Sequence, residues 1–288
     1  MIQAIIILLA LISGYLINFK FISNNLINKV LSITISLIIF IMGYNFGVLI
    51  LSLTDKILSM SAIISLFIAS LLIANTLSIK LFLILKPKYA IQSKTTNNRH
   101  TRPIGPILTS CVYLLYLTAG IILGYISGIS LTSADIYIDA LLVLTLFAIG
   151  IQLKREGLSL TQVLKNKTGI AISLVLIISS LLAGAITGYT LNIPIMTSLM
   201  LSSGFRWYSL SSILNAQLLD AHYGTMTFFI DFAREILAII LIPILAKTLP
   251  TELIGYSGAT AMDFTLPVIK ENIGIKAIPI AISTGFIL

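Results

Sequence analysis

Charged residues are scarce in this sequence. Asp, Glu, Lys and Arg make up 10% of its 288 residues, whereas soluble domains usually carry about 25%. Apolar residues make up 58%, and the mean hydropathy is +1.07. A water-soluble globule of this composition would expose large apolar patches and aggregate. The composition therefore excludes a soluble enzyme, a secreted scaffold, a disordered chain and a nucleic-acid-binding protein, and it indicates a polytopic membrane protein.

Cysteine is almost absent, and so are metal-binding motifs. Cys111 is the single cysteine and lies in an apolar run, which excludes a disulfide framework and a Cys-based metal site. The two histidines, His100 and His222, lie in or near linkers, and no HExxH motif occurs. We therefore expect neither a metal site nor a cofactor.

Long apolar runs fill most of the chain. A helix needs about 20 mostly apolar residues to span a membrane, and these runs are continuous rather than alternating as in a β-barrel. We predict an all-α membrane protein with about 8–10 transmembrane segments, two of which (194–218 and 252–269) are interrupted by polar and Gly residues. The candidate runs are 2–19, 30–53, 57–85, 105–127, 136–153, 169–191, 194–218, 224–247, 252–269 and 277–288.

Basic residues concentrate between apolar runs. Residues 86–102 contain five Lys and Arg and residues 154–167 contain four, whereas residues 128–135 and 190–194 contain none. Because basic loops stay in the cytoplasm, this pattern places both basic segments inside and the N-terminus outside. Residues 86–103 are therefore predicted to form a cytoplasmic linker.

The linker separates two similar pieces of sequence. "SGYLI" at 13–17 recurs as "LGYIS" at 123–127, and "FIMGYN" at 40–45 recurs as "FAIGIQ" at 147–152. If each piece holds three spans, the copies are inverted, as in many secondary transporters and cation/proton antiporters with broken helices. The matches could also arise by chance, and the glycines could serve only close helix packing.

This pattern divides the chain into four parts. We predict a first membrane repeat at 1–85, the linker at 86–103, a second repeat at 104–191, and a C-terminal membrane region at 192–288 that carries the transport site.

Charged residues interrupt the apolar run 224–247. "IDFAREI" contains Asp231, Arg234 and Glu235, whose spacings of three and four put them on one helical face. A charge inside a span costs about 2.5–3.5 kcal/mol, so such residues are candidates for function. An Asp231–Arg234 pair could merely hold helices together, but it would leave Glu235 without a partner.

The run 252–269 contains "SGATAMDFTLP". Pro267 should free the carbonyl of Asp263, and broken helices at membrane depth line cavities. We expect a half-helix N-terminus near Gly258–Thr260 to bind a carboxylate. The candidate binding residues of this run are Gly258, Thr260, Asp263 and Thr265.

A third polar stretch runs from Ser202 to Asn215. Its candidate substrate-pathway residues are Trp207, Tyr208, Ser209, Ser211 and Asn215. Alternatively, Trp207 and Tyr208 lie at the membrane interface and the serines bond their own helix. Arg206 could extend to the membrane surface.

Three motifs in this order resemble the LysO-type lysine exporters of bacterial inner membranes. They are "GFRWYSLSSIL" at 204–214, "DFAREILAIILIP" at 231–243 and "GATAMDFTLPVI" at 258–269, and "LFAIGIQLK" at 146–154 also fits. The resemblance implies export of L-lysine and its analogue thialysine, with essential acids matching Glu235 and Asp263. The sequence departs from the family at Arg206 and Ser212, where Gly is expected.

The residues agree with a basic substrate. Asp231, Glu235 and Asp263 against Arg234 give a formal charge of −2, which suits the two ammonium groups of lysine and could exchange lysine for protons. The expected partners are thus lysine, thialysine, protons and membrane lipid. The sequence leaves open whether the protein forms a homo-oligomer. The alternatives are an exporter of another basic amino acid, a cation/proton antiporter, an intramembrane aspartyl protease, whose motifs are absent, and a purely structural subunit.

Overall fold

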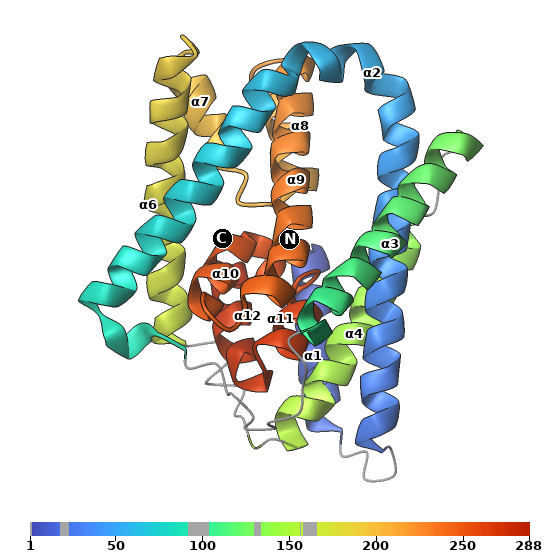
Figure 1. Cartoon of the computed structure of the whole chain (residues 1–288). Helices are drawn as coiled ribbons and strands as arrows, with labels where there is room; N and C mark the ends of the chain where they lie inside the picture. Colours follow the sequence, from blue (N-terminus) through green and yellow to red (C-terminus); the bar gives the residue numbers. More distant parts are fainter. Residues whose placement is uncertain (1, 18–22, 92–103, 130–133, 156, 158–165) are drawn as a thin grey trace.

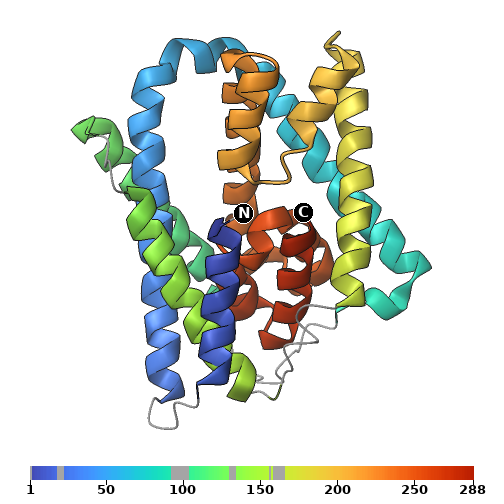
Figure 2. The ribbon, with the colours of Figure 1, turned by 180° about the vertical axis from the view of Figure 1, so that it is seen from behind.

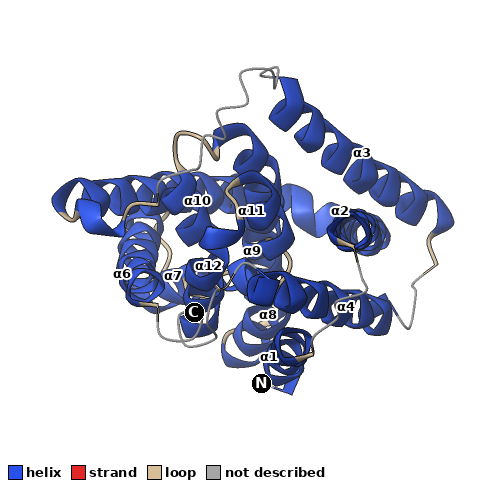
Figure 3. Cartoon of the chain, turned by 90° about the horizontal axis from the view of Figure 1, so that it is seen from below, coloured by secondary structure: helices blue, strands red, loops and turns tan. Residues whose placement is uncertain are grey.

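The computed structural model describes residues 2–17, 23–91, 104–129, 134–155, 157 and 166–288. Every regular element in these ranges is a helix, as the uniform colour of the ribbons in Figure 3 shows. The predicted all-α class is therefore confirmed. Among the described residues, four stretches are long and apolar enough to cross a membrane: Asn24–Val48, Met60–Leu85, Tyr137–Arg155 and Lys167–Thr190.

The N-terminal two thirds of the chain forms long helices. They are α1 (Ile2–Leu16), α2 (Asn24–Leu85), the short 3-10 turn η1 (Pro87–Tyr89), α3 (Ile104–Ser127), α4 (Ala134–Arg155) and α6 (Lys167–Thr190). The 62-residue α2 bends back on itself, so that its two apolar stretches form the two arms of an arch in Figure 1. The sequence predicted these arms as separate spans, whereas the structure joins them within one continuous helix.

Glycines let these helices pack closely in pairs. A Cβ atom on Gly14 of α1 would lie 2.1 Å from the carbonyl oxygen of Phe147 in α4. A Cβ atom on Gly43 of α2 would lie 2.4 Å from the carbonyl oxygen of Leu117 in α3. In both pairs only a residue without a side chain permits this backbone approach, which fits the packing interpretation of these glycines.

The C-terminal third consists of shorter, interrupted helices. They are α7 (Ile195–Ser202), α8 (Tyr208–Leu218), α9 (Ala221–Leu245), α10 (Pro250–Ser257), the 3-10 helix η2 (Gly258–Met262), α11 (Leu266–Asn272), the 3-10 turn η3 (Ile275–Ala277) and α12 (Ile278–Ile287). The two runs that were predicted to be interrupted are both interrupted. Figure 2 shows α10, α11 and α12 grouped between α1 and α6, and in Figure 1 α9 stands between the arms of α2.

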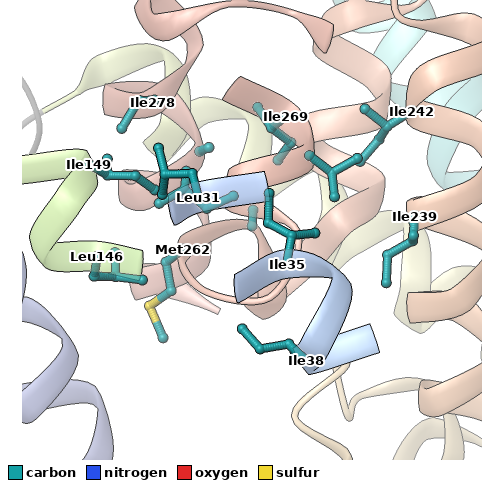
Figure 4. Close-up of a cluster of buried hydrophobic side chains, with 14 of the residues drawn as sticks. Leu31, Ile35, Ile38, Leu146, Ile149, Ile239, Ile242, Met262, Ile269 and Ile278 are labelled. Carbon is teal, nitrogen blue, oxygen red and sulfur yellow. The ribbon is translucent and has the colours of Figure 1, made fainter. Parts of the chain in front are cut away.

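A buried apolar cluster joins the two thirds. Figure 4 shows side chains from α2, α4, α9 and the C-terminal helices converging on one interior. Its labelled members are Leu31, Ile35, Ile38, Leu146, Ile149, Ile239, Ile242, Met262, Ile269 and Ile278. In a membrane such contacts stabilise the fold through close packing rather than through exclusion of water. This cluster fixes α9 and the interrupted helices against the long ones.

Candidate functional site

Two interrupted helices meet inside the protein. The first break, residues 203–207, separates α7 from α8, and the second, residues 258–265, separates α10 from α11. The amide N–H of Ala259 donates a hydrogen bond to the carbonyl oxygen of Phe205 at 2.9 Å. A Cβ atom on Gly258, whose φ is 61°, would lie 2.6 Å from the same oxygen, so only glycine fits there. The two breaks thus contact each other directly through their backbones.

Asp231 of α9 binds the first break. Its Oδ1 atom accepts hydrogen bonds from the Arg206 amide and from Nη1 of Arg234, each at 3.1 Å, and Oδ2 accepts one from Ser211 Oγ at 3.0 Å. Asp231 and Arg234 are fully buried, and they form the ion pair that their spacing predicted. A Cβ atom on Gly204 would lie 1.7 Å from Asp231 Oδ2, so this carboxylate is packed tightly against the break.

Glu235, one helical turn further along α9, has no such partners. It is fully buried, and neither carboxylate oxygen has a hydrogen-bond partner among the residues that the structure describes. The same holds for Nε and Nη2 of Arg234 and for the three guanidinium nitrogens of Arg206. The charges of Asp263 and Arg206 act on Glu235. Glu235 and the guanidinium of Arg206 are therefore both buried without a hydrogen-bond partner in the described structure, and an unpaired charge is costly in such a place.

Arg206 does not extend to the surface. Its side chain is 1% exposed, and its guanidinium carbon lies 4.0 Å from the centre of the Tyr256 ring of α10, a cation–π contact. The charged cluster therefore consists of Asp231, Glu235 and Asp263 with Arg206 and Arg234, and its formal charge is −1 rather than the predicted −2. The sequence places Arg206 next to the candidate pathway residues, but it does not indicate that this side chain is buried against Tyr256.

The threonines of the second break bond the break itself. The carbonyl oxygen of Thr260 accepts hydrogen bonds from the Thr265 amide at 2.9 Å and from Thr265 Oγ1 at 2.8 Å. Thr260 Oγ1 donates to the carbonyl oxygen of Ser257 at 2.8 Å. Both threonines are buried, so they satisfy backbone groups that the break leaves without helical partners.

Asp263 lies at the end of the same break and is half-buried. Its Oδ1 accepts a hydrogen bond from the Phe264 amide at 2.6 Å, and its carbonyl oxygen accepts one from Leu266 at 3.2 Å. The expectation that Pro267 frees this carbonyl is wrong, because a tight turn satisfies it. Gly258 follows the last residue of α10 and begins the 3-10 helix η2, whose Ala259 amide already donates to the carbonyl oxygen of Phe205.

The predicted pathway residues have separate environments. Trp207 precedes α8, and Tyr208 packs its ring edge-on against Phe232 of α9. Asn215 Nδ2 donates to the carbonyl oxygen of Met200 and to Thr227 Oγ1, which ties α8 to α7 and α9. The side chain of Ser209 lies outside the described residues. Ser211 touches the charged cluster directly, through its bond to Asp231.

A cavity of about 340 Å³ lies between the start of α2 and α11. Its polar lining comes from Asn28 and Ser32 on α2 and from Lys270 and Glu271 on α11. The hydroxyl of Tyr113 in α3 donates to Glu271 Oε2 at 2.6 Å. None of these lining residues was among the site residues predicted from the sequence. In the described part of the chain, no group of three or more His, Cys, Asp or Glu residues could hold a metal ion.

Comparison with known proteins identifies the family of this chain. Residues 114–288 match the family model "Lysine exporter LysO". The "Lysine exporter LysO" of Escherichia coli (strain K12) is 34% identical over 290 aligned residues, covering 99% of this chain and 94% of the relative. A "Putative lysine exporter" of Haemophilus influenzae (strain ATCC 51907 / DSM 11121 / KW20 / Rd) is 40% identical over 171 residues, which are 58% of this chain and 86% of that protein. No solved structure matches. The chain is therefore a multi-pass membrane protein that belongs to the LysO lysine exporter family.

Proposed function

We propose that this protein exports L-lysine across the bacterial inner membrane and that the charged cluster binds the substrate. The observation that carries this proposal is Glu235, a buried carboxylate that has no hydrogen-bond partner in the described structure and lies within electrostatic range of Asp263. A buried charge of this kind needs a cation to compensate it. The names of the relatives indicate which cation: an amino acid with an additional ammonium group.

The charges of cluster and substrate match. Lysine carries two ammonium groups and one carboxylate and has a net charge of +1, which neutralises the formal charge of −1 of the cluster. Glu235 and Asp263 would bind the ammonium groups, whereas Asp231 is already occupied by Arg234 and the first break. Thialysine carries the same charged groups at similar positions, so the same site should export it.

We further propose exchange of lysine for protons. When lysine leaves, the cluster keeps a net negative charge inside the membrane, which is unfavourable. One proton restores neutrality just as one lysine did. Each cycle would then move one lysine outward and one proton inward without net charge transfer.

Alternating access would follow from inverted repeats. Contacts in the α1–α4 pair have counterparts in the α2–α3 pair. A Cβ atom on Gly14 would lie 2.1 Å from the carbonyl oxygen of Phe147, and one on Gly124 would lie 2.1 Å from that of Tyr44. In Figure 1, α1 runs downward and α3 upward, while the first arm of α2 runs upward and α4 downward. This arrangement supports two copies of opposite orientation.

The glycine of α2 that is structurally equivalent to Gly150 is not the one that the short sequence match pairs with it. A Cβ atom on Gly150 would approach the carbonyl oxygen of Leu11 at 2.2 Å, and one on Gly47 would approach that of Ile121 at 2.1 Å. Gly150 therefore corresponds to Gly47 rather than to Gly43, a shift of one helical turn. A four-residue shift keeps the same helical face, which is why the sequence match chose the wrong glycine.

Transport by purified protein tests these proposals. In proteoliposomes loaded with labelled lysine, efflux should accelerate when the outside is made acidic at zero membrane potential, and a potential alone should not drive it. Glu235→Gln and Asp263→Asn should abolish efflux, whereas the control Asp220→Asn, at the exposed start of α9, should not. Efflux that ignores the pH gradient would refute the coupling, and full efflux by either of the first two variants would refute the site. If the protein transports ornithine or arginine in preference to lysine, the assignment of lysine as the substrate is wrong.

A further inference from the structure

Arg206 has features that the proposed lysine site does not yet explain. It is a nearly fully buried arginine in the first break, and Nε, Nη1 and Nη2 all lack a hydrogen-bond partner in the part of the chain that is described. A purely structural arginine normally uses its five N–H donors to bond carboxylates or carbonyl oxygens. Here the donors are in place and unused.

The guanidinium of Arg206 lies over the Tyr256 ring. The guanidinium carbon lies 4.0 Å from the ring centre, which is close enough for a cation–π contact. A cation–π contact is made through the charge of the guanidinium and does not occupy its N–H groups as a hydrogen bond to an oxygen would. The contact thus orients Arg206 without using its donors.

The backbone at this position is also unfavourable for a side chain. Phe205 and Arg206 have φ angles of 46° and 74°, in the left-handed region where glycine is favoured. The loop is nevertheless locked there, because Phe205 accepts the Ala259 bond and the Arg206 amide bonds Asp231. Strained residues in locked positions cluster at functional sites.

We propose that Arg206 binds the α-carboxylate of the substrate, so that the site selects basic amino acids over diamines of the same length. This inference rests on the proposed lysine site. A guanidinium binds a carboxylate through two parallel N–H···O bonds, while Glu235, whose charge interacts with that of Arg206, binds the ammonium end. The cluster then offers one free guanidinium and free carboxylates to a molecule that carries one carboxylate and two ammonium groups.

Binding measurements with three ligands test this inference. The ligands are lysine, 1,5-diaminopentane, which is lysine without its carboxylate, and norleucine, which is lysine without its side-chain ammonium. Arg206→Gln should weaken lysine binding about 10- to 100-fold, as expected for loss of a charged hydrogen-bonding pair. It should leave diaminopentane binding unchanged or stronger, because a repelling cation is gone. Arg206→Lys keeps the charge but loses the planar fork, so its preference for lysine should be intermediate.

A matched control is Arg155→Gln. Arg155 lies at the exposed end of α4 and donates to Asn24, so this variant should keep the wild-type ratio of lysine to diaminopentane affinity. Wild-type protein that binds diaminopentane as tightly as lysine would overturn the inference without any variant. Equal weakening of both ligands by Arg206→Gln would also overturn it, since Arg206 would then only support the structure of the site. Wild-type protein that binds none of the three ligands would refute the lysine site itself.

Discussion

The ion pair between Asp231 and Arg234 should stabilise the protein, and the replacement Asp231→Asn isolates its charge. The Oδ1 atom of Asp231 accepts the bonds from the Arg206 amide and from Arg234, and an asparagine oxygen can accept both. The amide NH₂ group would face Ser211, whose hydroxyl can accept a bond as well as donate one. The number of hydrogen bonds is therefore kept while the negative charge is lost.

The expected cost is that of a buried unpaired charge. Arg234 is fully buried, and removing one partner of such a pair destabilises a protein by about 3–5 kcal/mol. At roughly 2–4 °C per kcal/mol for a protein of this size class, the unfolding temperature should fall on the order of 10 °C. The double variant Asp231→Asn, Arg234→Gln removes both charges and should regain most of this loss, because neutral replacements of a buried pair are often tolerated.

Thermal unfolding in a fixed detergent and lipid mixture measures this cycle. Asp220→Asn serves as the control, because Asp220 caps α9 at an exposed position and asparagine caps helices equally well. If Asp231→Asn unfolds at the wild-type temperature, the ion pair contributes nothing. If the double variant is no more stable than Asp231→Asn, the loss does not come from Arg234, and the reasoning is wrong.

Three further outcomes are expected. Gly204→Ala should sharply lower the yield of folded protein, measured by size-exclusion chromatography, because its Cβ atom would collide with the carboxylate that binds the first break; normal yield would contradict the packing. In a cysteine-free background, Lys88→Cys should resist and Asn192→Cys should accept a membrane-impermeant thiol reagent added to intact cells; the reverse pattern would invert the topology. Cells without the gene and without a second exporter should grow poorly on thialysine, and unchanged growth would argue against lysine export.

The interruptions of the C-terminal helices could be predicted from the sequence. Gly, Ser, Thr and Pro are dense in the runs 194–218 and 252–269, and these residues end helices or bond the backbone locally. The Asp231–Arg234 pair was equally accessible, because a spacing of three residues brings two side chains together on any helix. The helix interruptions and the ion pair each depend on residues that are close in sequence, so the sequence pattern is enough to predict them.

Features that depend on distant contacts could not be predicted. The bond between Ala259 and Phe205 joins residues more than 50 positions apart, and nothing in the spacing of either break indicates it. The burial of Arg206 on Tyr256 follows from that contact. The continuous course of α2 was missed for another reason: residues 48–60 contain neither Gly nor Pro, so nothing ended the helix between two apolar runs.

The contact between the two breaks also bears on how the protein is made. The carbonyl oxygen of Phe205 enters the membrane during synthesis well before the amide of Ala259 that will pair with it. Until α10 and η2 arrive, this oxygen and the adjacent guanidinium need water or another protein beside them, since hydrocarbon cannot satisfy either group. Helix α9, by contrast, carries Asp231 and Arg234 one turn apart and brings its own neutralised pair into the bilayer. The bond that completes the first break, between α7 and α8, is therefore made only after α10 and η2 have followed, which makes assembly of the site a late step of biogenesis.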